Sequence, residues 1–149
     1  MSLDLEKIME EWAIEGKIPT HQLDETARQT PSLHAKYLKL RQLARLKLDD
    51  LKHLQKILLK EKWLYYNGKM DEKTLKDKGW EPDPFNGLRI LKGEMDYYYD
   101  SDPEIIASEK KIKYYESVDE TLTEILEHIK WRHQNIKNVI EWRKFEAGA

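Results

Sequence analysis

Cysteine is absent from the 149 residues of the chain, so disulfide bonds and zinc sites built on thiolates are excluded. Long apolar runs are also missing, and the first residues are acidic and amphipathic, with no cationic start. A membrane-spanning helix needs about 20 apolar residues in succession, and a secretory signal needs a basic start followed by an apolar stretch. We therefore expect a soluble intracellular protein with no membrane attachment.

The sequence also lacks the motifs of the common enzyme classes. Its two Gly-Lys pairs, at 16–17 and 68–69, have neither the preceding glycine nor the following Ser or Thr of a phosphate-binding loop. His128 and His133 fall on different faces of a helix, and no third metal ligand lies nearby in the sequence. We predict no catalytic residue, no metal site and no cofactor. A metal-dependent nuclease that uses the acidic helices is the enzymatic alternative, and release of labelled nucleotide in magnesium would support it.

Charged residues are abundant, at 36% of the chain, but the formal net charge is only −2. Residues 36–69 hold ten Lys or Arg against three acids, residues 100–127 hold nine acids against three bases, and residues 128–145 hold five bases against one acid. Such separated blocks suit a polyanion on one surface and protein contacts on another. The alternative is that solvated helix faces segregate by charge without a function.

Apolar residues recur every three or four positions over most of the chain, which predicts a single, mainly α-helical domain over residues 1–149. The N-terminal helices are expected within 1–30. Ser2 is the predicted cap of the first helix, and Gly16 is its predicted end.

One long basic helix is predicted over 31–67. The Thr30-Pro31 pair is typical of a helix start, and Asn67-Gly68 is typical of an end. A helix of this length cannot bury its apolar stripe within one small domain, so we expect it to pack on another long helix or on another subunit. The stripe consists of Leu33, Tyr37, Leu40, Ala44, Leu48, Leu51, Leu54 and Leu58.

The rest of the chain is predicted as an irregular connection over 68–102, followed by C-terminal helices over 103–149. The connection is rich in glycine, proline and aromatic residues, and Leu88 to Leu91 is its candidate strand. The final helix is expected from about 117 to 145. Arg132 interrupts the apolar stripe of that helix. A charged residue in the stripe favours a position at the mouth of a cavity or at a seam between subunits over a closed core.

The end of the long basic helix combines lysines with aromatic rings. Cations attract phosphates, and aromatic rings stack on unpaired bases of any sequence, so this combination is typical of single-stranded nucleic-acid binding. In the alternative interpretation Trp63 and Leu64 belong to a core, the tyrosines pack at the helix end, and the lysines only solvate the surface. The residues of the predicted patch are Lys56, Lys60, Lys62, Tyr65, Tyr66 and Lys69.

Two stretches have more specific patterns. The first is Leu59-Lys60-Glu61-Lys62 followed by Tyr65-Tyr66-Asn67-Gly68-Lys69, and the second is Lys130-x-Arg132, Ile136-Lys137, Ile140 and Arg143-x-Phe145-Glu146-Ala147-Gly148. Both stretches resemble the UvsY family of phage recombination mediators. The first is similar to the family's Leu-Lys-x-Arg element and its Tyr-Tyr-x-Gly-Arg sequence, and the second is similar to the end of the family's chains. Residues 70–115 match only loosely.

The resemblance implies a non-enzymatic mediator that binds single-stranded DNA in the cytoplasm of an infected bacterial host. It implies a ring-like homo-oligomer of six or seven subunits. It also implies that the protein helps a UvsX-like recombinase to replace the phage single-strand-binding protein during recombination and repair.

By position, the resemblance assigns DNA contacts to Lys60 and Lys62. Lys62 stands where the family commonly has an arginine, and lysine lacks the planar guanidinium, so its contact could be shared with Lys56, Arg41 or Arg45. The C-terminal helix would carry self-association, for which an ordinary intramolecular core is the alternative. The residues concerned are Ile129, Ile136, Ile140, Trp142 and Phe145.

The main alternative function is a helical structural or adaptor protein of a phage. Such a protein would oligomerise through the same helices, and its basic blocks would serve protein contacts only. Strong oligomerisation without DNA affinity at low salt would favour this structural or adaptor function.

Overall fold

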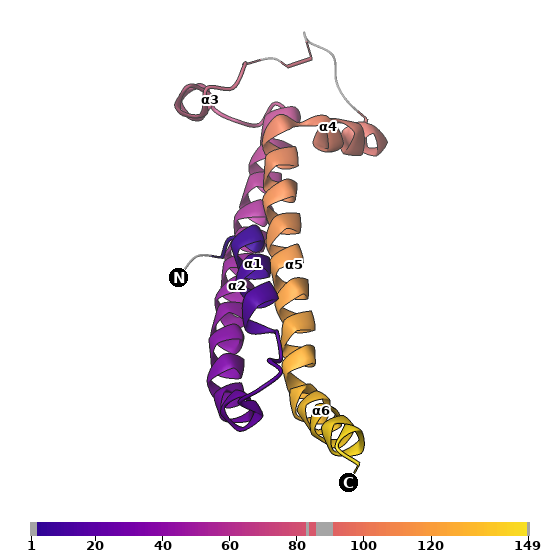
Figure 1. Ribbon diagram of the computed structural model, residues 1–149. Coiled ribbons are helices and arrows are strands. Elements are labelled where there is room, and N and C mark those ends of the chain that lie inside the picture. The colour runs from indigo at the N-terminus through magenta and orange to yellow at the C-terminus, as the bar shows by residue number, and fades with distance from the viewer. Residues whose placement is uncertain (1–2, 83, 86–90, 149) are drawn as a thin grey trace. The chain divides into compact units, whose positions relative to one another are not determined.

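The computed structural model describes residues 3–82, 84–85 and 91–148, and within these residues it contains helices and no strand (Figure 1). The prediction of a mainly α-helical protein is confirmed. The chain divides into two compact units, the first unit (residues 1–48 with 114–149) and the second unit (residues 49–113). No helix in the described ranges is both long and apolar enough to cross a membrane.

The first unit packs three helices around a hydrophobic core. α1 (Leu5–Glu15) lies along the first part of α2 (Leu23–Tyr66) and the last part of α5 (Pro103–Lys130), as Figure 1 shows. Each helix buries one side because its apolar residues recur every three or four positions. The ring of Trp12 meets the edge of Tyr37, with centroids 5.6 Å apart. The core cluster consists of Ile8, Tyr37, Leu40, Ala44, Val118, Leu122, Ile125, Leu126 and Ile129.

Local sequence signals explain both ends of α1. The side chain of Asp4 accepts a hydrogen bond from the backbone N–H of Lys7 (3.0 Å), so Asp4 is the N-cap. The predicted cap, Ser2, lies outside the described residues. Gly16 ends the helix as predicted. A Cβ atom at Gly16 would come within 2.8 Å of the carbonyl oxygen of Trp12, so the close approach requires glycine.

The long helix begins earlier than the sequence pattern predicts. α2 starts at Leu23, and Pro31 lies inside the helix, so the predicted start at Thr30-Pro31 is wrong. Proline removes one helical hydrogen bond, here to the carbonyl of Ala27. Ala27 and Pro31 are both exposed, so water can satisfy that carbonyl. Leu23 and Thr26 are buried, which keeps the additional turns attached to the unit.

The second unit contains the end of α2, the start of α5 and three short helices between them. These are α3 (Glu72–Lys78), the 3-10 helix η1 (Lys92–Glu94) and α4 (Met95–Ser101). The connection predicted as irregular is therefore partly helical. Such short helices have little stability alone, and α3 and α4 each bury one apolar side chain, Leu75 and Met95. Of the candidate strand, Leu88 to Ile90 lie outside the described residues, and Leu91 precedes η1.

The C-terminal region contains helices from residue 103 onward, as predicted, but the final helix predicted from about 117 to 145 is divided between two helices. α5 begins at Pro103, directly after Asp102, whose carboxylate accepts hydrogen bonds from the backbone N–H groups of Glu104 (2.9 Å) and Ile105 (3.2 Å). α5 ends at Lys130, and after a break at Trp131 the chain continues as α6 (Arg132–Glu146). The single final helix was a wrong prediction.

Arg132, expected at a mouth or a subunit seam, lies inside the first unit instead. It is 6% exposed, and its guanidinium donates hydrogen bonds to the carbonyl oxygens of Gly16 (3.3 Å) and Lys17 (3.4 Å), just beyond α1. The last carbonyl groups of a helix lack partners within the helix, and a basic side chain satisfies them. Burial lowers the pKa of Arg132 from its ordinary value. The residue thus joins the end of α1 to the start of α6.

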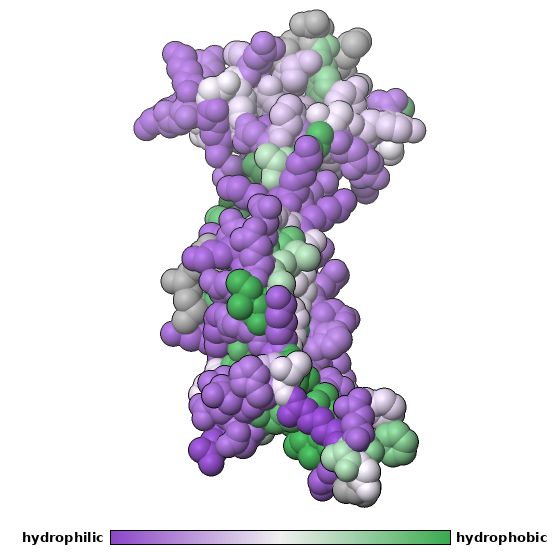
Figure 2. Space-filling view, viewed as in Figure 1, coloured by the Kyte–Doolittle hydropathy of each residue, from purple (hydrophilic) through white to green (hydrophobic). Residues whose placement is uncertain are grey.

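The face of the molecule in Figure 2 is mostly hydrophilic, with hydrophobic residues in separate patches. Large apolar side chains that remain exposed are candidates for contacts with partners where they gather in one place. Those more than half exposed among the described residues are Met9, Ile14, Leu46, Leu54, Ile57, Leu91, Tyr97, Trp131, Trp142 and Phe145.

Candidate nucleic-acid interface

The end of α2 in the second unit presents a row of lysines beside an exposed tryptophan. Lys52, Lys56, Lys60 and Trp63 follow one another at intervals of four, four and three, so they share one side of the helix. All four are exposed, Trp63 to 42%. Lys69 follows just after the helix, and its Nζ lies 4.6 Å from the centroid of the Trp63 ring. We call these five residues the basic face.

The basic face has the two chemical properties that a single strand requires. No carboxylate among the described residues forms an ion pair with its four lysines, so their charges are available to phosphates. The exposed indole of Trp63 is available to stack on a base. One interpretation of the sequence places Trp63 in a core, and the predicted patch does not include it. Its helical spacing from Lys56 and Lys60 was the signal that could have identified it.

Lys62 lies away from the basic face, in the interior of the second unit. It is 4% exposed, and its Nζ forms ion pairs with Asp102 Oδ2 (3.0 Å) and Glu104 Oε1 (3.4 Å). The same Nζ lies 3.8 Å from the centroid of the Trp80 ring. A strand bound to the surface of the unit does not reach this ammonium group. The structure therefore separates the two lysines to which the sequence resemblance assigned one role.

A network of polar side chains surrounds the Lys62 ammonium group. Tyr66 donates its hydroxyl hydrogen to Asp102 Oδ2 (2.6 Å), and the Trp80 Nε1–H donates to Glu104 Oε1 (2.5 Å). We call Lys62, Tyr66, Trp80, Asp102 and Glu104 the Lys62 cluster. Burial alone would raise the pKa of Asp102, but hydrogen bonds from Tyr66 and Lys62 outweigh it and hold the pKa below its ordinary value. The cluster joins the end of α2 to the start of α5.

Acid is expected to destabilise the second unit through Asp102. Because the pKa of Asp102 is lower in the folded than in the unfolded chain, its ionised form stabilises the fold above its ordinary pKa of 3.8. That stability is lost as the pH falls through the lowered pKa. In urea unfolding followed from pH 6 to pH 2, Asp102→Asn should flatten the acid dependence, whereas Asp100→Asn, at an exposed neighbour, should leave it unchanged. Equal profiles for both variants would contradict this role of Asp102.

The two predicted stacking tyrosines also face inward. Tyr65 is 8% exposed and lies against Trp80, with ring centroids 5.0 Å apart. Tyr66 is half-buried among aromatic rings, including Tyr98 at 5.8 Å and Phe85 at 5.5 Å. Burial raises the pKa of Tyr66, and its hydrogen bond to Asp102 adds to that effect. These rings hold the second unit together and do not offer open faces to a base.

Arg41 and Arg45 belong to the first unit, whereas the lysines of the basic face belong to the second unit. Both approach a single carboxylate, Asp119 Oδ1, from their Nε atoms, Arg45 at 3.2 Å and Arg41 at 3.5 Å. One negative charge therefore faces two positive charges, and a net positive charge remains on this part of α2.

The residues predicted for self-association divide into a buried and an exposed group. Ile129 and Ile136 are 2% and 5% exposed and pack inside the first unit. Ile140, Trp142 and Phe145 are 39%, 61% and 70% exposed, and the rings of Trp142 and Phe145 stack with centroids 5.5 Å apart. We call these three residues the apolar tip of α6. Of the five predicted residues, the three of the apolar tip have surface left for a second copy of the chain.

Comparison with known proteins places these features in a family context. The family described as "Recombination, repair and ssDNA binding protein UvsY" matches residues 11–149. Among solved structures, the fold is similar to crystal structures of the bacteriophage T4 recombination mediator protein UvsY. Its lattice type II form has a TM-score of 0.80 and 24% identity over 97% of this chain and 98% of that chain. The lattice type IV form has a TM-score of 0.80 and 23% identity over 97% and 99%. No curated protein matches the chain.

Proposed function

Because the chain belongs to the UvsY family, we propose that it binds single-stranded DNA through the basic face and acts as a mediator in phage recombination and repair. In this role it helps a UvsX-like recombinase to load onto DNA that is covered by the phage single-strand-binding protein. It carries out no catalysis itself and works in the cytoplasm of the infected host. The observation that carries the proposal is the row of exposed lysines beside Trp63, none of which forms an ion pair within the described part of the chain.

The basic face supports binding that is independent of base sequence. Its lysines can neutralise a few phosphates per subunit, and each neutralised phosphate makes affinity depend more steeply on salt. Trp63 can stack on an unpaired base, which a duplex does not offer. Of the two lysines that the family resemblance singles out, Lys60 takes the DNA-contact role and Lys62 takes a structural role.

Self-association would turn this modest surface into a tight binding site. We propose that the apolar tip of α6 joins copies of the chain into a ring-like homo-oligomer. A ring repeats the basic face once per subunit, so a strand held by one subunit meets the next at high local concentration. Weak contacts in each subunit then add up to tight binding along a wrapped strand.

Fluorescence-anisotropy titration of labelled single-stranded and duplex DNA at several salt concentrations tests the proposal. We expect tight, steeply salt-dependent binding that prefers the single strand. Absent binding at low salt, together with stable oligomers, would favour the adaptor function instead. Binding that prefers duplex would contradict a role for base stacking.

A triple variant tests the assignment of the basic face. Lys56→Ala, Lys60→Ala and Lys69→Ala together should weaken single-strand affinity by about 100-fold and lower the salt slope by about 2 for each bound subunit, since each phosphate contact contributes about 0.7. Sedimentation should show the same oligomer as the unchanged protein. The matched control removes the exposed lysines 110, 111 and 113 of α5, with the same change of charge in the same unit. Equal losses in both triple variants would show that overall charge, and not this face, binds DNA.

A further inference from the structure

An exposed tryptophan marks the point where α5 ends and α6 begins. Trp131 is 53% exposed, although Ile129, two residues before it, and Arg132, directly after it, are buried. Its ring is nevertheless oriented, because its Nε1–H donates a hydrogen bond to Glu127 Oε1 (3.0 Å). An aromatic ring that is held in place but left open to solvent is a surface on which a flat ligand can stack.

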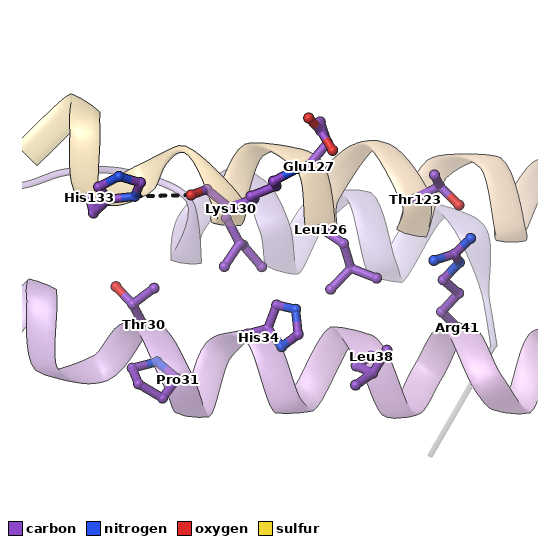
Figure 3. A pocket seen from close by; sticks show the side chains of 11 residues that line it. Thr30, Pro31, His34, Leu38, Arg41, Thr123, Leu126, Glu127, Lys130 and His133 are labelled. Atoms are coloured by element: carbon purple, nitrogen blue, oxygen red, sulfur yellow. Dashed lines mark hydrogen bonds between the residues drawn. The ribbon is translucent and has the colours of Figure 1, made fainter.

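His133, in the first turn of α6, has its ring close to this tryptophan. The two rings are nearly parallel, at 20°, and their centroids are 6.5 Å apart. The Nδ1–H of His133 donates to the carbonyl oxygen of Lys130 (3.0 Å), which fixes the imidazole ring (Figure 3, dashed line). Successive bases of a strand are about 3.4 Å apart, so the two neighbours of a stacked base are separated by roughly 6.8 Å. The spacing of Trp131 and His133 is close to that value.

A groove of about 560 Å³ lies between α2 and α5 in the first unit, and His133 is one of the residues that line it (Figure 3). His34 and Arg41 extend from α2 toward α5, and Lys130 and His133 line the other wall. The Nζ of Lys130 also lies 5.8 Å from the Trp131 ring centroid. Leu38 and Leu126 form an apolar floor.

The charged side chains that line the groove are Arg41 and Lys130 against one acid, Glu127, so positive charge is in excess. Glu127 accepts the hydrogen bond from Trp131, and its carboxylate lies on the side of α5 away from α2 in Figure 3. Asp119 is shared by Arg41 and Arg45, which leaves one of these two guanidinium charges uncompensated. Cations next to an open aromatic ring form the combination that holds a phosphate and stacks its base.

We propose that the junction of α5 and α6 is a second site for single-stranded DNA, separate from the basic face. One base enters between Trp131 and His133, and the adjacent phosphate meets Lys130 and Arg41. The site requires an unpaired base, because a base inside a duplex is stacked on its neighbours. The inference rests on the proposed function, since it adds a contact to the same ligand.

Two variants separate the contribution of the ring from that of the charge. Trp131→Leu should weaken binding of an oligo(dT) strand about fivefold or more, the loss expected for one stacked base, without changing the salt slope. Lys130→Ala should lower the slope by roughly 0.7 per bound subunit. The matched control is Tyr97→Leu, which removes a ring that is 76% exposed in the second unit and should bind like the unchanged protein. Unfolding temperatures should be equal for the unchanged protein and all three variants.

Photo-crosslinking locates the bound base directly. A strand that carries 5-iodouracil in place of thymine should crosslink to Trp131 or His133, and mass spectrometry of the peptides should show it. The proposal is overturned if the unchanged protein binds and crosslinks only at the basic face, or if Trp131→Leu alters sedimentation but not affinity, which would make Trp131 a subunit contact. If the unchanged protein binds no single strand, the proposed function fails first and this inference fails with it.

Discussion

Replacing Lys62 with methionine is expected to lower the free energy of unfolding by about 3–5 kcal/mol, the usual loss when one partner of a buried ion pair is removed. The Asp102 carboxylate would stay buried without the cation that lies 3.0 Å away. Lys62 and Asp102 are 4% and 3% exposed, so water cannot replace the lost partner. Urea unfolding followed by circular dichroism measures the loss.

Two further variants make this prediction specific. Lys60→Met, at an exposed position two residues earlier, should change the unfolding free energy by less than about 0.5 kcal/mol. Combining Lys62→Met with Asp102→Asn should restore much of the stability, because asparagine still caps α5 and carries no buried charge. A Lys62→Met variant as stable as Lys60→Met would show that the Lys62 cluster does not hold the second unit together.

The same double variant tests whether Lys62 touches DNA. If Lys62 is structural, the folded Lys62→Met/Asp102→Asn protein should bind single-stranded DNA with unchanged affinity and salt slope. Loss of a direct phosphate contact would instead lower the slope by roughly 0.7 per subunit. Comparing the Lys62 single and double variants therefore separates an effect on folding from an effect on binding.

Removing residues 140–149 is expected to abolish the proposed self-association and leave monomers. The deletion takes away the whole apolar tip of α6 but retains Arg132 and Ile136, which are 6% and 5% exposed and complete the first unit. The monomer should therefore remain folded, with helical circular dichroism and a cooperative thermal transition. Single-strand affinity should fall by a factor of about 100 or more, since linked sites gain 10²–10⁴ in avidity. Analytical ultracentrifugation measures the assembly.

Shorter and longer deletions control this experiment. Removing only 147–149, beyond the apolar tip, should leave both assembly and affinity unchanged. Removing the chain from Ile136 onward takes away a buried residue and should destabilise the first unit. A protein without 140–149 that still sediments as the full oligomer would contradict the assignment of self-association to the apolar tip.

Features that depend on neighbouring residues could be predicted from the sequence. The helical class follows from apolar residues spaced every three or four positions. The end of α1 at Gly16 and the start of α5 at Asp102-Pro103 follow from local backbone and capping preferences. The segment of Lys56 to Lys69 was identified as basic and aromatic from composition alone. The start of α2 was missed because proline is tolerated inside a helix where water can satisfy the carbonyl that loses its partner.

Which residues of that segment face solvent was decided by tertiary structure. Lys60 and Lys62 are two positions apart, about 200° around a helix, and the sequence treats both as surface lysines. Lys62 is buried because Asp102, forty positions later, meets it. In the same way, Arg132 turns inward because the carbonyl groups of Gly16 and Lys17 lack partners, and no glycine or proline marks the break beside it. Helix formation depends on residues that are close in the sequence, so it can be predicted from short segments. Burial and ion pairing depend on residues that only the folded chain brings together.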